Sequence, residues 1–281
     1  MTTVRLIMPQ WQGGNNPDYA FGSELLAWLA PKGKTTKEIR VPMNEQTDLQ
    51  LEDGVVGRQA VTEQLMSAKH ILTNEKPERV VVLGGDCLVE QAPIDYLNGL
   101  YDDLGVLWID AHPDISSPEM MSHSHAMVLA NLLGDGDKPL AGKVEHPLKR
   151  EQVAFVGLNN PAGYEAEYVA QDGFTDIRHD TIEKTIDATK KWLKDNSFKH
   201  VMIHFDVDAL DPTYFHATLL AKPYGEPIDA PKGVMHLQEV VDLAKSVSEE
   251  TDVVGFGITE HLPWDMIHLC NSLAQISIFN D

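Results

Sequence analysis

Two polar segments of the sequence carry side chains of the kinds that bind metal ions. The first, 110–114, reads DAHPD and directly follows the apolar stretch 104–109. In an extended chain, side chains at i, i+2 and i+4 share one side, so Asp110, His112 and Asp114 can converge. Three ionisable groups beside a buried strand are costly unless a cation compensates them. The alternative is a polar loop whose acids cap a helix.

The second segment repeats this arrangement. Asp206 and Asp208 are spaced i, i+2 and follow the apolar stretch 200–205. An Asp-x-Asp pair by itself is common, and a solvated turn is its ordinary explanation. Asp211 directly precedes Pro212, which predicts a turn at that position.

Taken together, the two segments supply five potential ligands: Asp110, His112, Asp114, Asp206 and Asp208. Four carboxylates and one imidazole suit hard or borderline divalent ions such as Mn²⁺. Because carboxylates can bridge, such a set can hold two ions about 3.5–4 Å apart. A water shared by the ions would be acidified enough to act as a nucleophile near neutral pH.

The elements that must position these residues are short apolar stretches alternating with longer amphipathic ones. Strands are predicted at 4–8, 79–83, 104–109, 152–158, 200–205 and 252–258, and helices at 55–72 and about 181–194, the latter opened by Asp180 as N-cap. Strands that are apolar without alternation are buried on both faces. The sequence therefore predicts an α/β fold with a mostly parallel sheet, whose strand ends carry the site. Without an evident linker, 1–281 is expected to be a single domain.

Composition limits the possible partners. The chain has 281 residues and a net charge of −21, from 43 acidic and 22 basic side chains. Such a surface repels phosphate backbones and anionic lipid, so neither nucleic acid nor membrane is expected as a partner, and it favours a cationic substrate. Two cysteines far apart make no disulfide framework, which favours the cytoplasm. The sequence contains neither a signal-peptide pattern nor an apolar run of the ~20 residues needed to span a bilayer.

The order of motifs resembles the ureohydrolase family, which includes arginase and agmatinase. The resemblance covers nearly the whole chain and is carried by GGD at 84–86, DAHPDI at 110–115, His125 with Met127, FDVDALDP at 205–212, and Thr259-Glu260 with Pro263 and Asp265. It implies a three-layer α-β-α sandwich, assembled into a homo-oligomer, either a trimer or a hexamer.

The resemblance also implies a role for each site residue. Two Mn²⁺ ions would be bridged by Asp110 and Asp206. Asp114 would bind one ion and hydrogen-bond a bridging hydroxide, and His112 and Asp208 would bind the other ion. Glu260 would hold a cationic guanidino or amidino group while His125 shuttles protons. The implied reaction is hydrolysis of a C–N bond, which gives an amine and urea, or an amide from a formimidoyl substrate.

Cys87 departs from the family pattern, because it stands where the family has a metal-binding histidine after GGD. A thiolate ligand is softer than imidazole and favours Zn²⁺, Fe²⁺, Co²⁺ or Ni²⁺ over Mn²⁺. A buried apolar filler is the alternative for a free cysteine. A two-metal site with Cys87 as ligand, a one-metal site and a metal-free site all remain open.

The loops expected to bind substrate also differ from those of arginases. Ser116 stands where arginases have asparagine, and 159–162 reads NNPA where they carry an arginine. L-arginine is therefore not the expected substrate. His123 is either an additional site residue or an exposed loop residue, and Trp264 is either a pocket wall or a core aromatic.

Two functions are compatible with these patterns. One is a ureohydrolase-like enzyme, and the other is a non-catalytic relative with a weakened or absent metal site that acts as a binding or oligomeric scaffold protein. Retention of the acids favours the enzyme, because clustered carboxylates without a cation would destabilise the fold. A thiol enzyme based on Cys87 is disfavoured, since the sequence has no Cys-x-x-Cys motif.

Overall fold

A central parallel sheet organises the molecule. The computed structural model describes residues 2–161, 163–171, 173–177, 180–225, 228 and 230–275. In this part of the chain an eight-stranded sheet has the order β2-β1-β5-β10-β9-β6-β7-β8, and every paired strand is parallel. Its strands are β1 (Thr3–Met8), β2 (Thr36–Arg40), β5 (Arg79–Gly84), β6 (Leu104–Ile109), β7 (Val153–Val156), β8 (Thr175–Ile177), β9 (His200–Asp206) and β10 (Asp252–Thr259).

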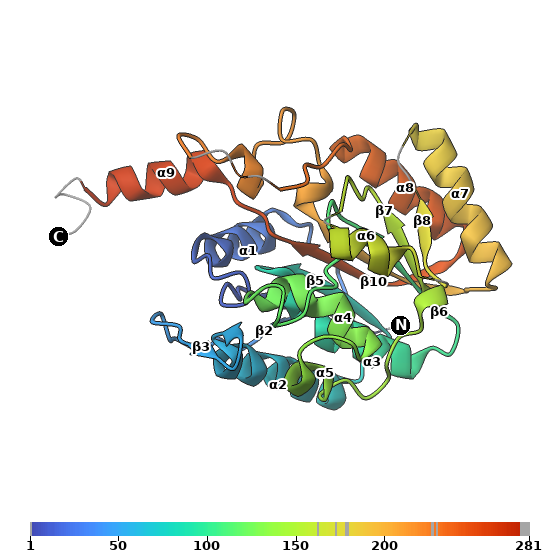
Figure 1. The fold of residues 1–281 in the computed structure, drawn as a ribbon, viewed down its shortest axis with the longest axis horizontal. Coiled ribbons are helices and arrows are strands. Elements are labelled where there is room, and N and C mark those ends of the chain that lie inside the picture. Colours follow the sequence, from blue (N-terminus) through green and yellow to red (C-terminus); the bar gives the residue numbers. More distant parts are fainter. Residues whose placement is uncertain are drawn as a thin grey trace.

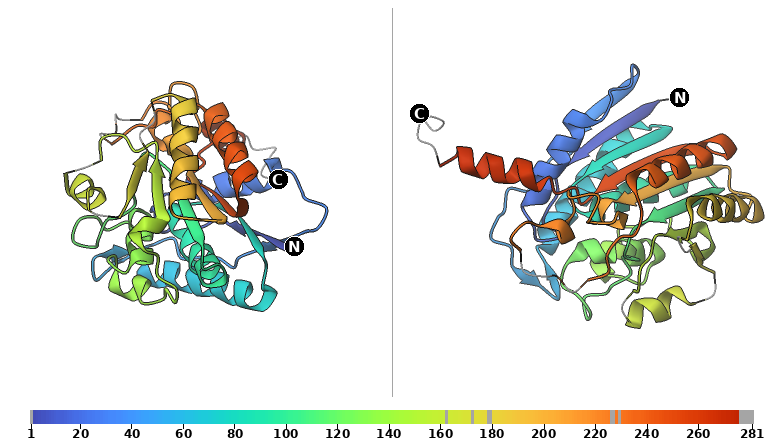
Figure 2. Two further views of the ribbon diagram at one scale, coloured as in Figure 1. Left: turned by 90° about the vertical axis from the view of Figure 1, so that its right-hand side faces the viewer. Right: turned by 90° about the horizontal axis from the view of Figure 1, so that it is seen from above.

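Helices cover both faces of this sheet (Figure 1). The helices are α1 (Asp18–Leu29), α2 (Arg58–Glu75), α3 (Gln91–Leu100), α4 (Val128–Leu133), α5 (Lys138–Ala141), α6 (Gly163–Val169), α7 (Ile182–Asp195), α8 (Leu237–Glu250) and α9 (Trp264–Leu273). Figure 2 shows α2 and α3 on the side of the sheet opposite to α7 and α8. The predicted three-layer α-β-α sandwich is therefore confirmed.

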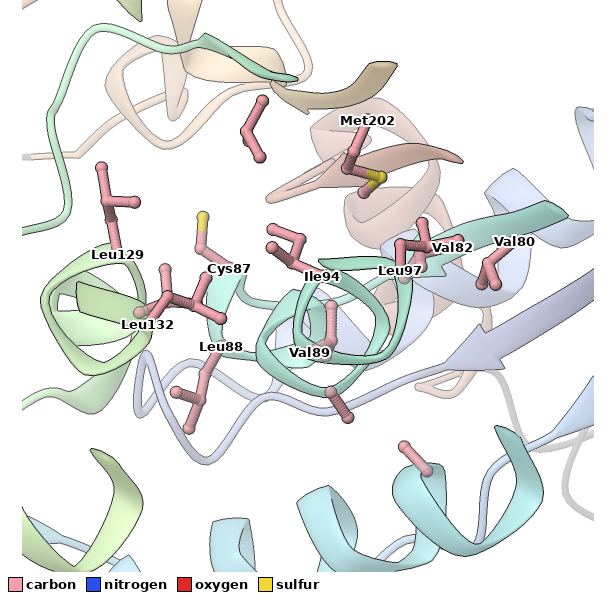
Figure 3. Packing of buried hydrophobic residues seen from close by; sticks show 14 of the residues in the cluster. Val80, Val82, Cys87, Leu88, Val89, Ile94, Leu97, Leu129, Leu132 and Met202 are labelled. Atoms are coloured by element: carbon pink, nitrogen blue, oxygen red, sulfur yellow. The ribbon is translucent and has the colours of Figure 1, made fainter. Parts of the chain in front are cut away.

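The core consists of separate clusters on the two sheet faces. On one face, side chains of α2, α3 and α4 pack against alternate residues of the strands, and on the other, α7 and α8 do the same. Figure 3 shows part of the first cluster, where Val80 and Val82 of β5 lie beside Ile94 and Leu97 of α3. Because the strands bury both faces, their sequences lack the alternation typical of a sheet with one face exposed to solvent.

Two predicted helix starts were wrong. The helix expected at 55–72 begins only at Arg58, because Val55–Val56 forms strand β4 against β3 (Leu51–Glu52) and Gly57 has a positive φ of 61°. In the later helix the N-cap is Thr181, whose hydroxyl accepts a hydrogen bond from the Lys184 amide, whereas Asp180 pairs with the Lys184 ammonium. The strand expected at 152–158 spans only Val153–Val156, and Gly157 with φ 92° ends it.

Other elements were not predicted, among them helices α1, α3, α8 and α9. Strands β2 and β8 lie at the two edges of the sheet and were not predicted, because edge strands in this chain are polar or brief. Within the described residues, no helix combines the length and apolarity that crossing a bilayer requires.

Candidate metal centre

The predicted ligands meet at the carboxyl ends of the central strands. Strands β5, β10, β9 and β6 are neighbours, and their carboxyl ends lead into the segments that carry Cys87, Glu260, Asp206 and Asp110, respectively. The carboxyl ends of parallel strands lie on the same side of the sheet, so four separate segments of the chain converge there. Among the described residues, three groups of potential ligands result, and in each group one atom per residue lies within 4.8 Å of the others. The groups are Cys87, Asp110, Asp114 and His204; Cys87, Asp206 and Glu260; and Asp110, His112 and Asp208.

His112 lies between two carboxylates, as its spacing predicted. Its Nδ1 is 2.9 Å from Oδ2 of Asp208 and 3.6 Å from Oδ1 of Asp110. Burial alone would lower the pKa of His112, but the charge of Asp208 and hydrogen bonds to both acids raise it well above its usual value. Burial raises the pKa of Asp208 to about 6. A divalent cation bound by His112 and Asp208 would supply the positive charge between the carboxylates that protonated His112 supplies here.

Cys87 contacts the second acidic segment. Its Sγ donates a hydrogen bond to Oδ2 of Asp206 over 2.8 Å and lies 3.7 Å from Oε1 of Glu260. Burial, together with these negative neighbours, raises the pKa of the Cys87 thiol well above its usual value, and burial also raises the pKa of Asp206. Figure 3 shows the Cys87 sulfur directed away from Leu88, which points into the apolar cluster. A metal ion at this position would provide the charge needed to deprotonate the thiol.

Asp114 supplies the observation that best tests whether the residues fit a cation. Its Oδ2 is buried and has no hydrogen-bond partner among the described residues. Its φ of 51° is unusual for a residue other than glycine, and such conformations are concentrated at functional sites. Burial and the charge of Asp110 raise its pKa well above the usual value. A buried acceptor without a donor, among further carboxylates, is the chemistry of a cation site, so the donor set fits divalent metal.

Glu260 also joins a hydrogen-bonded group with His125 and Tyr19. Its Oε1 lies 2.6 Å from Nδ1 of His125, and its Oε2 accepts a 2.6 Å hydrogen bond from the hydroxyl of Tyr19. Burial alone would lower the pKa of His125, but the charge of Glu260 raises it to about 9. Burial alone would raise the pKa of Glu260, but the charge of His125 holds it below its usual value. Two residues to which the sequence analysis gave separate roles are thus brought together, with Tyr19 as a partner that the sequence did not reveal.

Asp86 supports the site without joining any of the three ligand groups. Its carboxylate accepts hydrogen bonds from the Gln10 side chain and from the backbone amides of Gly13, Gly14 and Leu88. Burial raises its pKa to about 6. Asp86 therefore fixes the loop after β1 against the turn after β5.

His204 and Glu90 were not identified from the sequence. Both are completely buried, and His204 Nδ1 lies 3.1 Å from Oε2 of Glu90 while its Nε2 lies 3.4 Å from Oδ2 of Asp110. The two acids raise the pKa of His204 to about 10 against the opposing effect of burial. A signal for His204 was present, because it lies two residues before Asp206 and so shares its side of the strand.

The remaining candidates have clear places. His123 is half-buried, and its ring centroid is 6.2 Å from that of His125. Trp264 is a core aromatic, 3% exposed, and it donates a hydrogen bond to the Thr218 carbonyl over 2.7 Å.

Ser116 Oγ lies 2.7 Å from the hydroxyl of Tyr164, while Asp211 accepts two hydrogen bonds within its own exposed turn. Of the segment 159–162, Ala162 lies outside the described residues.

Comparisons with known proteins agree with this architecture. A model of the Arginase family matches residues 23–267, and the chain belongs to this family. An arginase of Staphylococcus aureus (strain COL) is 31% identical over 139 residues, which are 47% of this chain and 46% of that arginase. An arginase of Schizosaccharomyces pombe is 26% identical over 199 residues, 67% of this chain and 58% of that protein. The matches thus span about half the length of these relatives.

Solved structures show the same fold. Entamoeba histolytica arginase in complex with L-ornithine superposes with a TM-score of 0.80 at 20% identity, covering 93% of this chain and 92% of that one. Bacillus subtilis arginase gives 0.76 at 22% identity, covering 94% and 91%. Proclavaminate amidino hydrolase from Streptomyces clavuligerus gives 0.64 at 18% identity, covering 93% and 83%. At these identities the likeness concerns the fold.

Proposed function

We propose that the chain, as one catalytic domain, is a metal-dependent hydrolase that cleaves a C–N bond of a small guanidino or amidino compound. The observation that carries the proposal is the convergence of buried carboxylates from two distant segments, 110–114 and 206–208, beside the Glu260–His125 pair. Membership of the arginase family supports the reaction class.

Two divalent ions are the proposed cofactors. Asp110 and Asp206 would lie between them, Asp114 and Cys87 would hold one, and His112 and Asp208 the other. Mn²⁺ follows from the family resemblance, whereas Cys87 shifts the preference toward Zn²⁺, Fe²⁺, Co²⁺ or Ni²⁺. When bound, the ions supply an acidified water and positive charge beside the reacting carbon.

Glu260 is proposed to bind the cationic group of the substrate. Its carboxylate is buried and its pKa is lowered, so it carries the negative charge that a guanidinium needs in a desolvated site. Tyr19 and His125 each fix one of its oxygens. The excess of acidic residues over the whole chain favours approach of a cation.

His125 is proposed to hold the proton that the leaving amine requires. One water adds its oxygen to the planar carbon, the C–N bond to the amine breaks with its electron pair going to nitrogen, and that nitrogen gains a proton. His125 and the buried carboxyl of Asp114 are the proposed donors, because the pKa values of both groups are raised. The products are an amine and urea, or an amide from a formimidoyl substrate.

Other properties follow from the resemblance and the composition. We propose a cytoplasmic homo-oligomer, trimeric or hexameric, that uses neither nucleic acid nor membrane as a partner. L-arginine is not the proposed substrate, because Ser116 and 159–162 differ from the arginase pattern and Ser116 is engaged with Tyr164.

Elemental analysis of the purified protein, combined with urea and ammonia release across a panel of guanidino and formimidoyl compounds, tests the proposal. We expect two equivalents of metal per chain after loading with Mn²⁺, Zn²⁺, Co²⁺ or Ni²⁺, and turnover of at least one compound. Protein that binds none of these ions and remains inert would instead support a non-catalytic binding or scaffold role.

A further inference from the structure

A buried imidazole lies directly beneath the candidate metal centre. His204 is 0% exposed, and its ring stacks on that of Trp108 with centroids 3.8 Å apart. In the sheet register, His204 of β9 pairs with Trp108 of β6 and with Gly257 of β10. The next same-side positions along β9 and β6 are Asp206 and Asp110, so the ring lies one row below the carboxylates.

The surroundings of His204 are built to hold a second buried group, Glu90. A side chain on Gly257 would overlap with Oε1 of Glu90, so glycine at this strand position makes room for the carboxylate. Glu90 is 0% exposed, and neither of its oxygens has a hydrogen bond of good geometry among the described residues. Its Oε2 nevertheless lies 3.1 Å from Nδ1 of His204, which leaves Nε2 facing Asp110.

Nε2 of His204 belongs to a compact set of four donors. Cys87, Asp110, Asp114 and His204 each contribute one atom, and all four atoms lie within 4.8 Å of one another. Asp114 brings to this set a carboxylate whose Oδ2 is buried and has no hydrogen-bond partner among the described residues. Four donors at such separations match the spacing of ligands about 2.0–2.3 Å from one ion.

We propose that His204 is a metal ligand, and that Cys87, Asp110, Asp114 and His204, together with the shared Asp206, hold one of the two ions, a borderline ion such as Zn²⁺, with Glu90 orienting the imidazole. The proposal rests on the metal-dependent function proposed above. It accounts for the loss of the imidazole expected at position 87, because the nitrogen comes instead from β9, which lies two strands away from β5 in the sheet. One thiolate and one imidazole beside the carboxylates suit Zn²⁺, Fe²⁺ or Co²⁺ better than Mn²⁺.

Glu90 is placed to orient the imidazole of His204. Histidines that bind metals commonly donate their other ring N–H to a carboxylate, which fixes the tautomer and raises the basicity of the ligating nitrogen. Here Glu90 faces Nδ1, while Nε2 faces the site. A purely structural ion pair between Glu90 and a permanently protonated His204 is the competing explanation, and it predicts that metal binding is independent of both residues.

X-ray absorption spectroscopy of the native sequence tests the ligand set without a mutation. Protein loaded with one equivalent of Zn²⁺ is expected to show one sulfur at about 2.3 Å and imidazole nitrogen at about 2.0–2.1 Å. The His112→Asn variant should retain the imidazole signal, and His204→Asn should lose it. A Zn²⁺ environment that contains no sulfur, or that keeps its imidazole in His204→Asn, would overturn the proposal.

Affinity measurements provide an independent test with a milder change. Glu90→Gln is nearly isosteric, and it is expected to weaken Zn²⁺ binding about 10–100-fold, measured by competition with a chromophoric chelator. His200→Asn is the matched control, because His200 lies at the other end of β9 and pairs with Asp103. Unchanged affinity in Glu90→Gln, with a thermal midpoint of the metal-free protein equal to that of the native protein, would contradict the role of Glu90.

The outcomes separate this inference from the proposed function. If guanidino or amidino compounds are hydrolysed and Zn²⁺ binding is unchanged by substitution of His204 and Glu90, the ligand assignment is wrong and the function stands. If Zn²⁺ binding depends on both residues but no such compound is hydrolysed, the ligand assignment stands and the function is wrong.

Discussion

The sulfur of Cys87 donates a hydrogen bond to Oδ2 of Asp206 over 2.8 Å, although the two residues are 119 positions apart in the chain. This contact joins the turn after β5 to the end of β9 and places a soft donor beside hard ones. For the proposed metal centre, Cys87 as a ligand would favour borderline ions over Mn²⁺, because thiolate is a softer donor.

Replacing the thiol should change metal preference. In Cys87→Ser we expect the affinity for Zn²⁺ relative to Mn²⁺ to fall by at least about tenfold, or about 1.4 kcal/mol, because the hydroxyl is a harder and weaker ligand. The ratio is measured by competition binding of the two ions. Cys270→Ser, at an exposed position, is the control. An unchanged ratio in Cys87→Ser would show that the sulfur does not bind metal.

Loss of a proposed bridging carboxylate should abolish both metal binding and turnover. Asp206→Asn removes one negative charge and one metal-binding oxygen at the point where Cys87, Glu260 and Asp208 also meet. The side chain at this position can then no longer bridge the two proposed ions. Metal content after dialysis should fall below one equivalent per chain. Asp211→Asn, in an exposed turn, should keep its metal. Full activity in Asp206→Asn would mean that the site lies elsewhere.

The His125–Glu260 pair predicts a pH dependence of stability in the metal-free protein. The pKa of His125 is raised to about 9, so its contribution is complete below about pH 6.5 and is lost as pH rises through 9. The pKa of Glu260 is lowered, so its contribution is present above about pH 4.5 and is lost as pH falls further. The pair therefore stabilises the fold most between these limits.

This window can be measured by urea unfolding of the native protein and His125→Asn. The native protein should be more stable by on the order of 2–3 kcal/mol near pH 6, and this difference should disappear by about pH 10. His123→Asn is the control, because burial lowers the pKa of His123, so the opposite trend or none is expected. A difference that grows above pH 9 would contradict the assignment.

The space left by Gly257 should be intolerant of a side chain. In Gly257→Ala the added methyl group would overlap with the carboxylate of Glu90 between packed strands, so we expect a loss of about 1–3 kcal/mol in unfolding free energy. Gly163→Ala is the control, because its Cβ would meet nothing within 4 Å. Equal stability of the two variants would show that Glu90 can move away at little cost.

The sequence alone determined the central strands and the candidate ligands that follow them. Apolar stretches such as 104–109 and 200–205 predicted buried parallel strands, and Asp110, His112, Asp206 and Asp208 were identified because polar groups directly follow those strands. This information is local, since hydrophobic patterning and i, i+2 spacing depend only on residues close in the chain. The boundary at Gly57 was missed because helical periodicity continues through Val55–Val56, which pairs as a strand instead.

Only the tertiary structure decided which distant side chains meet. Tyr19 and Glu260 are 241 positions apart, and their hydrogen bond exists because α1 packs near the end of β10. His204 lies within the predicted strand 200–205 and Glu90 follows the predicted strand 79–83, and only the sheet register places them beside Gly257 and Asp110. Such contacts depend on strand order and on the volume left by neighbouring side chains, and neither quantity is encoded in a local pattern of residues.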